Sequence, residues 1–221
     1  MRVEDAGTLA RKGRAPSRCD RLPPVMTPRA QAILDEQARH RERLEAFSRS
    51  LTDEELAEKV PGTPWTVHGY IAHLATIDSL ISPFLAPLVG ITDVSRPELP
   101  PPAPFDIDQW NEAIVPLRAG VSVDELLSEA AKHRAEYVRV LSALSDEQLD
   151  MMIPFGGDRK VIDLPPTQVR LEDLLWAIAL HDPNHTQDIL RAIPHREPDV
   201  RDWLAGSDFA RIPEEITARR A

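Results

Sequence analysis

The stretch "ALHDPNHTQDILRAI", Ala179 to Ile193, combines the apolar spacing of a buried helix with two histidines one turn apart and a proline between them. At about 100° per residue, His185 lies on the same side of this helix as Ile178, and His181 lies at the edge of that face. Two imidazoles at positions i and i+4 of one helix face can bind a single cation. The stretch therefore predicts a core helix that carries part of a metal site.

A second histidine-bearing helix is predicted in "PWTVHGYIAHLATIDSLISPFLAPLVG", residues 64–90. Thr66 is suited to cap this helix and Pro83 to kink it. His73 falls at the edge of its inner stripe, whose apolar residues repeat at helical spacing: Tyr70, Leu74, Ile77, Ile81, Phe84 and Leu88. If the two helices pack together, His73 completes a set of three imidazoles, which leaves open positions for water or substrate, as catalytic sites do.

The spacing alone leaves other interpretations open. An inward histidine is commonly a core residue that hydrogen-bonds a carbonyl, so histidines that are merely packed, without a metal, are one alternative. Asp182 could cap a helix that restarts at Pro183, which would rotate His185 relative to His181. Asp182 could instead orient a ligand histidine or act as a general base.

The first and the last of the predicted long helices lie at the two ends of the domain. The first covers residues 28–50, with Thr27 as its cap and Pro28 in its first turn. The "TDEEL" sequence that follows is expected to form one turn. The last helix, which carries the histidine pair, is expected over residues 167–193.

The third long helix is predicted over residues 123–144. Ser122 and Glu125 have the spacing of a capping box at its start. Its inner stripe is expected to consist of Leu127, Ala131, Val138 and Leu141.

Four amphipathic helices with few strand signals predict an all-α four-helix bundle. The proline-rich segment over residues 91–104, followed by a short helix over 106–118, is long enough for a crossover between the second and third helices. We expect the bundle domain over residues 26–193. A flexible leader is expected over 1–25, and a C-terminal tail over 194–221 that packs on the bundle or trails from it.

The composition excludes several classes of protein. The chain has 221 residues, of which 42% are hydrophobic, and it shows no unbroken apolar run of membrane-spanning length. Cys19 is the only cysteine, which excludes an internal disulfide and a cysteine-based metal cluster. The formal net charge of −10, without a basic stripe, argues against a nucleic-acid partner. We expect a cytoplasmic protein that acts on a small molecule.

The two histidine-bearing stretches also resemble a known family. "PWTVHGYIAHLATID" and the distal "LHDPNHTQDI" are similar to the DinB-like superfamily of metal-dependent four-helix bundle proteins, which includes the amino-terminal domain of mycothiol-dependent maleylpyruvate isomerase. In such proteins a Trp and a small polar residue open the second helix, a histidine follows some eight residues on, and an H-D/E-x-x-H pattern lies on the last helix. The resemblance covers roughly residues 27–193.

The resemblance implies that His73, His181 and His185 bind one divalent cation, which could be zinc, nickel, iron or manganese. It also implies an up-up-down-down order of helices and a homodimer. Trp110 and Asn111 resemble a pair found before the third helix in relatives, and we expect them to line the mouth of the pocket.

Arg134 falls on the apolar stripe of the third helix, where a charge must be paired or useful. It could anchor an anionic substrate group or form an internal salt bridge. Trp65 is expected to be a packing anchor, and Trp203 and Phe209 are expected to dock the tail on the core. His68 faces away from His73. Three further histidines lie among charged residues and are expected to be solvated: His40, His133 and His195.

The sequence supports two hypotheses of different classes. The first is a metal-dependent enzyme that hydrolyses a small molecule or transfers a low-molecular-weight thiol such as mycothiol or bacillithiol. In it, Asp182 and Arg134 are the candidate catalytic residues. The second is a metal-stabilised binding or stress-response module without turnover. Open coordination positions on the metal favour the enzyme, whereas a fourth protein ligand favours the structural role.

Overall fold

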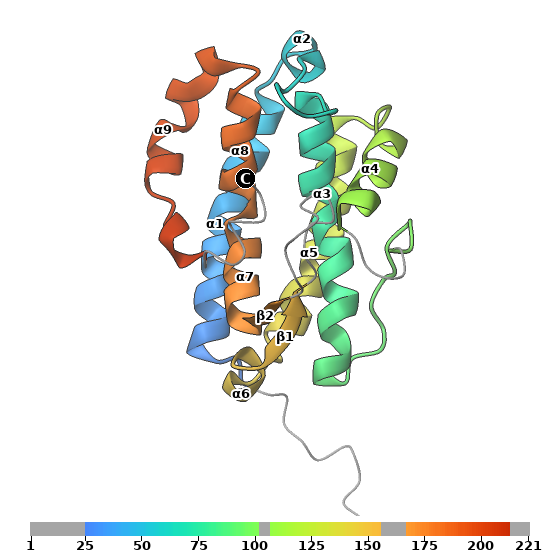
Figure 1. Ribbon diagram of the computed structural model, residues 1–221, viewed down its shortest axis with the longest axis vertical. Helices are drawn as coiled ribbons and strands as arrows, with labels where there is room; N and C mark the ends of the chain where they lie inside the picture. The colour runs from blue at the N-terminus through green and yellow to red at the C-terminus, as the bar shows by residue number, and fades with distance from the viewer. Residues whose placement is uncertain (1–24, 102–106, 156–166, 213–221) are drawn as a thin grey trace, which may run out of the picture.

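The computed structural model describes residues 25–101, 107–155 and 167–212. The expected leader lies outside these ranges except for Val25, and so do Cys19 and the end of the tail. The described chain is mainly helical, which confirms the predicted all-α bundle (Figure 1). Its long helices are α1 (Pro28–Arg49), α3 (Val67–Leu85), α5 (Val123–Leu141) and the consecutive pair α7 (Leu171–Ala179) and α8 (His181–Leu190).

The four helical columns run up, down, down and up. One apolar cluster, the lower apolar cluster, joins the start of α1 to the end of α3, the end of α5 and the start of α7. The cluster at the other end joins the end of α1 to the starts of α3 and α5 and the end of α8. The predicted crossover between α3 and α5 is therefore confirmed, and the up-up-down-down order is wrong. The connection between α1 and α3 reverses the direction of the chain. The long connection between α3 and α5 carries the chain back to the end of the bundle where α3 begins, so α5 runs parallel to α3 (Figure 1).

The connections carry shorter elements. They are α2 (Asp53–Ala57), η2 (Ala86–Val89), α4 (Ile107–Leu117) and α6 (Asp146–Leu149). The "TDEEL" turn is confirmed as α2, and the short helix expected before α5 is confirmed as α4.

The predicted helix starts are confirmed by their caps. The Thr27 hydroxyl accepts a hydrogen bond from the Ala30 amide at 3.2 Å, and Thr66 accepts one from Gly69 at 3.1 Å. Ser122 and Glu125 form the expected reciprocal capping box at the start of α5. Each cap satisfies an amide that the helix itself cannot bond.

The start of the predicted last helix is wrong, because residues 167–170 form a strand. β1 (Met152–Phe155) pairs antiparallel with β2 (Thr167–Arg170), and Ile153 faces Val169. Both of these side chains are buried against the lower apolar cluster, whereas their neighbours Met152 and Arg170 are exposed. Such alternation is typical of a half-buried strand, but only the pairing of two distant segments makes four residues stable as a strand.

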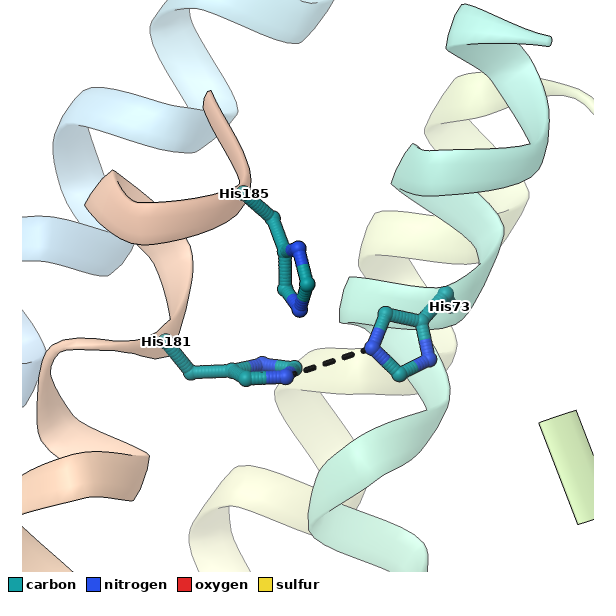
Figure 2. Close-up of side chains that lie close together, drawn as sticks. All are labelled: His73, His181 and His185. Atoms are coloured by element: carbon teal, nitrogen blue, oxygen red, sulfur yellow. Dashed lines mark hydrogen bonds between the residues drawn. The ribbon is translucent and has the colours of Figure 1, made fainter. Parts of the chain in front are cut away.

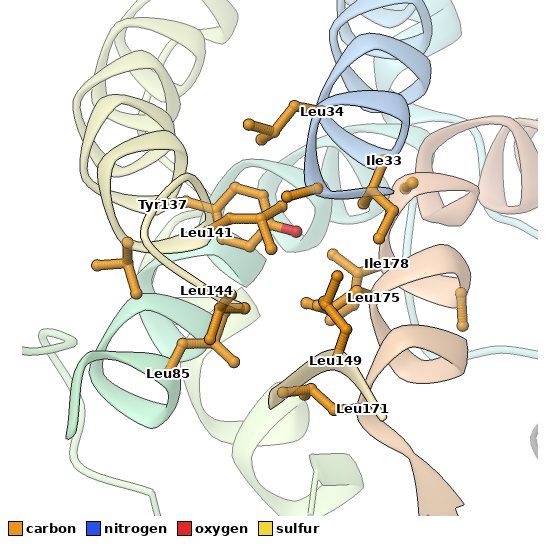
Figure 3. Packing of buried hydrophobic residues seen from close by; sticks show 14 of the residues in the cluster. Ile33, Leu34, Leu85, Tyr137, Leu141, Leu144, Leu149, Leu171, Leu175 and Ile178 are labelled. Atoms are coloured by element: carbon orange, nitrogen blue, oxygen red, sulfur yellow. The ribbon is translucent and has the colours of Figure 1, made fainter. Parts of the chain in front are cut away.

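The inner stripe of α5 is also shifted from its predicted position. Ala131 and Val138 are exposed, and the buried residues are Leu126, Leu127, Ala130, Tyr137, Val140 and Leu141. On α3, Phe84 is likewise exposed, at 48%. The shift arises because α5 packs on α3 and on α1 together, so the buried face is set by two neighbours (Figure 3).

Most residues of helix α3 are buried. With η2 it forms the segment Val67–Val89, the one helical segment among the described residues that is long and apolar enough to cross a membrane by length and composition. Of its most apolar window, 67% is buried inside the protein, as in a core helix. α3 continues through Pro83 and ends at Leu85.

The C-terminal segment packs on the bundle through η3 (Pro194–Arg196), α9 (Glu197–Ala205) and η4 (Phe209–Arg211). Trp203 is 7% exposed and Phe209 packs against the lower apolar cluster, so both expected docking contacts are confirmed. The prediction that His40 is solvated is wrong, since it is 0% exposed. Its Nδ1 accepts a hydrogen bond from Trp203 Nε1 at 2.8 Å, and its Nε2 lies 2.8 Å from Oε1 of Glu36.

The contacts of His40 make stability depend on pH. Nδ1 accepts from the indole, so protonation of His40 would place two donors against each other. Burial lowers the pKa of His40, opposed by Glu36 and assisted by Arg39. A histidine that folds neutral binds fewer protons in the native than in the unfolded state, so stability falls as pH drops through the unfolded pKa of about 6.5.

We expect His40→Gln to flatten this pH dependence. The wild type should lose up to about 1.4 kcal/mol more stability than the variant between pH 7.5 and pH 5.5, because glutamine does not titrate. Urea unfolding at both pH values measures the difference. Equal losses in the two proteins would contradict the assignment to His40.

Candidate metal centre

Three histidines converge between α3 and α8, as the sequence predicts. His73 is 3% exposed and His181 is 7% exposed, while the side chain of His185 is 18% exposed. One nitrogen from each ring lies within 4.8 Å of the others. The ring centres of His181 and His185 are 4.5 Å apart, and that of His73 lies 4.9 Å and 5.1 Å from them (Figure 2).

Two of the three rings are oriented by partners on their outer nitrogens. Nδ1 of His73 lies 3.1 Å from Oδ1 of Asn111 on α4, and Nδ1 of His185 lies 2.9 Å from Oδ2 of Asp188 one turn along α8. An oxygen that accepts from Nδ1–H leaves Nε2 as the atom with a lone pair. Oxygen partners of this kind fix the tautomer and the direction of a metal-binding imidazole.

Pro183 leaves the geometry of the histidine pair intact. α7 ends at Ala179, Leu180 adopts φ −93° and ψ 5°, and α8 restarts at His181. Both histidines therefore belong to α8 and keep the i, i+4 relation. Pro183 stands in the first turn of α8, where a missing N–H costs little. The predicted cap at Asp182 is wrong, because Leu180 occupies the N-cap position without a side-chain hydrogen bond.

The donor set fits a divalent cation. The Nε2 atoms of His73 and His181 lie 3.2 Å apart. Two imidazole nitrogens bound tetrahedrally at about 2.0–2.1 Å from zinc are separated by ~3.3 Å. Among the described residues, this group of potential metal ligands consists of the three histidines alone, without a cysteine or a carboxylate. Three neutral nitrogens therefore could hold a metal and leave at least one coordination position for another molecule.

A buried network of charges lies beside the histidines, and each helical column contributes one member. Nε of Arg41 lies 3.1 Å from Oδ2 of Asp182, and Nε of Arg134 donates to Oδ2 of Asp78 at 2.8 Å. Arg41 Nη2 also lies 3.9 Å from Asp78. Burial raises the pKa of Asp182, while Arg41 and then Arg134 oppose the shift. These residues lie between the two apolar clusters, so the charges form a polar layer at mid-bundle.

The internal salt bridge that the sequence allowed for Arg134 is confirmed by its bond to Asp78. Asp182 contacts Arg41, as described above. A catalytic role for either residue stays a prediction, since their described contacts are with other charged groups of the protein rather than with a histidine.

Trp110 and Asn111 are consecutive residues of α4, but their side chains contact different parts of the structure. Asn111 contacts His73, as described above. Trp110 is 1% exposed, its Nε1 donates to the Leu99 carbonyl at 2.8 Å, and it borders a cavity of about 150 Å³. The described lining of this cavity includes Arg118 and His133 but none of the three clustered histidines, His73, His181 and His185. A role of Trp110 at the mouth of the metal pocket stays a prediction.

Trp65 links the histidines to a larger groove. Its ring lies 5.2 Å from that of His73 and 5.2 Å from that of Tyr70, which fits the predicted packing role. Trp65 also lines an open groove of about 1130 Å³ at the end of the bundle where α3 and α5 begin. A Cβ on Gly69 would lie 3.1 Å from the Cβ of Trp65, so glycine allows this close approach.

The other histidines lie away from the triad. His68 bonds the Val121 carbonyl at 2.8 Å, which confirms that it faces elsewhere. His195 is exposed, as predicted, and lies 2.8 Å from Glu55. His133 is half-buried at the small cavity.

The family model of the DinB superfamily matches residues 36–189, which include all three histidines and every long helix in whole or in part. The chain belongs to the DinB superfamily. A comparison with curated proteins gave no match. The resemblance seen in the two histidine-bearing stretches is therefore confirmed at the level of the family.

Sequence reasoning missed three residues around this DinB-superfamily centre. Asp188 follows His185 by three residues, a helical spacing that could have identified it. Asp78 stands alone in the most apolar helix, which signals a buried charge that needs a partner. Arg41 gives no such signal, because it lies in the charged run "RHRER" and only the packing shows that it points inward.

We expect Asn111→Leu to weaken metal binding about 10- to 100-fold, because the leucine cannot accept a bond from Nδ1 of His73. Asn111→Asp keeps an acceptor oxygen at the same place and should retain the affinity. Competition titration of Zn²⁺ against a chromophoric chelator measures both. Equal affinities for the leucine and aspartate variants would show that Asn111 does not orient His73.

Proposed function

We propose that this DinB-superfamily protein is a metal-dependent enzyme that hydrolyses a small molecule or transfers a low-molecular-weight thiol of the mycothiol or bacillithiol type to it. The observation that carries the proposal is the incomplete ligand set, which consists of His73, His181 and His185 without a fourth protein ligand among the described residues. A structural metal site is normally closed by four protein ligands, whereas a catalytic site keeps a position open.

Three features support the proposal: the orientation of the imidazole rings, the access of solvent to the site, and the groove lined by Trp65. Asn111 and Asp188 hold the outer Nδ1 atoms of two rings, so that the inner nitrogens point at one place. Access from solvent is easiest beside His185, the least buried of the three. Trp65, whose ring lies 5.2 Å from that of His73, also lines the open groove, which has room for a small molecule although none of the three histidines is among its lining residues. When bound, a divalent cation supplies a Lewis acid that lowers the pKa of a water or thiol toward neutrality.

The proposal includes a zinc, nickel, iron or manganese ion, a cytoplasmic location and a homodimer. A small-molecule substrate rather than nucleic acid is supported by the net charge of −10. The alternative, a metal-stabilised module without turnover, predicts the same bound ion but no reaction.

The test is the metal content of protein purified without an affinity tag. We expect about one divalent cation per chain in the wild type, and loss of that ion in His73→Ala and His185→Ala while the helical circular dichroism persists. His195→Ala is the matched control, because His195 is an exposed histidine bonded to Glu55 and should leave the metal in place. A wild type that holds no metal and ignores added zinc, nickel and manganese would leave three packed histidines and contradict the proposal.

The metal-loaded protein then distinguishes the two chemistries. Product formation that requires mycothiol or bacillithiol identifies the transferase, and product formation in water alone identifies the hydrolase. Metal binding without turnover in either screen would favour the non-catalytic module.

A further inference from the structure

A single guanidinium contacts the chain beside two of the three histidines. Nε of Arg41, on α1, lies 3.1 Å from Oδ2 of Asp182, the residue that follows His181. Nη2 of the same side chain donates to the carbonyl of Leu74, the residue that follows His73, at 3.1 Å. Arg41 is 7% exposed and Asp182 is 3% exposed, so water screens this contact only weakly.

The contact with Asp182 sets the rotation of α8. Consecutive residues of a helix point about 100° apart. When the Asp182 side chain is held against α1, His181 is turned toward α3 and so is His185, one turn further along. Figure 2 shows both rings extending from α8 toward His73 on α3. A small rotation of α8 about its axis would move both imidazoles together away from His73.

The first turn of α8 needs such an anchor because its backbone holds it weakly. Leu180 interrupts the helix, and no side chain caps the restart. Pro183 has no N–H, so it forms no bond to the Ala179 carbonyl one turn earlier. Leu180 still bonds the Trp176 carbonyl at 3.0 Å and accepts from the Asn184 amide at 3.1 Å, so the backbone ladder at this junction is thinned rather than broken, and a side-chain contact adds to what holds the histidine-bearing turn.

The neighbouring carboxylate of Asp78 does not compete with Asp182 for Arg41. Asp78 has its own cation, since Arg134 donates to it at 2.8 Å, whereas Arg41 lies 3.9 Å away. The short contacts of Arg41 thus go to Asp182 and to the Leu74 carbonyl. These two contacts come from α8 and α3, which carry all the histidines of the cluster.

We propose that Arg41 is a positioning residue of the metal site, which clamps the chain next to His181 and His73 and so sets the distance and direction of the imidazoles. This inference rests on the proposed metal binding. It goes beyond that proposal because it assigns the orientation of the imidazole rings to Arg41, whose described contacts are with other groups than those rings.

The test compares Arg41→Lys with Arg29→Lys. Lysine keeps the charge at position 41, so neither Asp78 nor Asp182 loses its cation, but a single ammonium cannot reproduce the planar fork that spans Asp182 and Leu74. Arg29 is the matched control, because it also lies on α1 and joins it to Glu172 of α7, at the far end of the bundle from the histidines. The probe is Co²⁺, whose visible absorption reports ligand geometry, with thermal unfolding measured alongside.

We expect Arg41→Lys to bind Co²⁺ at least about tenfold more weakly and with an altered absorption band, and Arg29→Lys to match the wild type. Equal Co²⁺ affinity and spectrum in all three proteins would overturn the clamp, and so would equal losses in the two variants. If Arg41→Lys does not fold, Asp182→Asn takes its place with the same criteria. A wild type that binds no Co²⁺ would instead refute the metal site itself, a result distinct from failure of the clamp.

Discussion

The contact between Arg41 and Asp182 is the interaction on which the geometry of the histidine cluster depends. It is buried, it joins α1 to α8, and it lies in a polar layer to which each column of the bundle contributes one charged residue. Buried ion pairs add little net stability compared with well-packed apolar side chains, but they penalise every arrangement that separates the partners. The apolar clusters above and below therefore supply the stability, and the polar layer selects one rotation and register of the helices.

This division of roles accounts for the features that a simple bundle would lack. A leucine ridge along residues 179–193 would pack as well, but it would not bring two imidazoles to face His73. The break at Leu180 lets α8 begin in its own direction, and Pro183 is tolerated because it falls in the first turn of that new helix. The parallel arrangement of α3 and α5, created by the crossover, places α4 where Asn111 can reach His73.

What could be predicted from the sequence is mainly what is local or periodic. The caps at Thr27, Thr66 and Ser122 depend on neighbouring residues, and the structure confirms all three. The histidine pair follows from helical spacing, while His73 as its partner came mainly from the resemblance to the DinB-like superfamily. The errors concern properties set by distant partners. Helical periodicity predicts Val138 inside, but packing on two neighbouring helices leaves it exposed; the charged neighbours of His40 predict a solvated ring, but Trp203 covers it. The strand at residues 167–170 and the direction of each helix likewise depend on contacts that no short stretch encodes.

The central claim is that His73, His181 and His185 bind one cation and leave part of its coordination open. X-ray absorption at the zinc edge of the zinc-loaded protein tests it most directly. The account predicts about three imidazole nitrogens at roughly 2.0–2.1 Å, with one or two further light ligands that a small added thiol replaces by sulfur. A shell without imidazole, or a closed shell of four protein ligands that no added thiol alters, would contradict it.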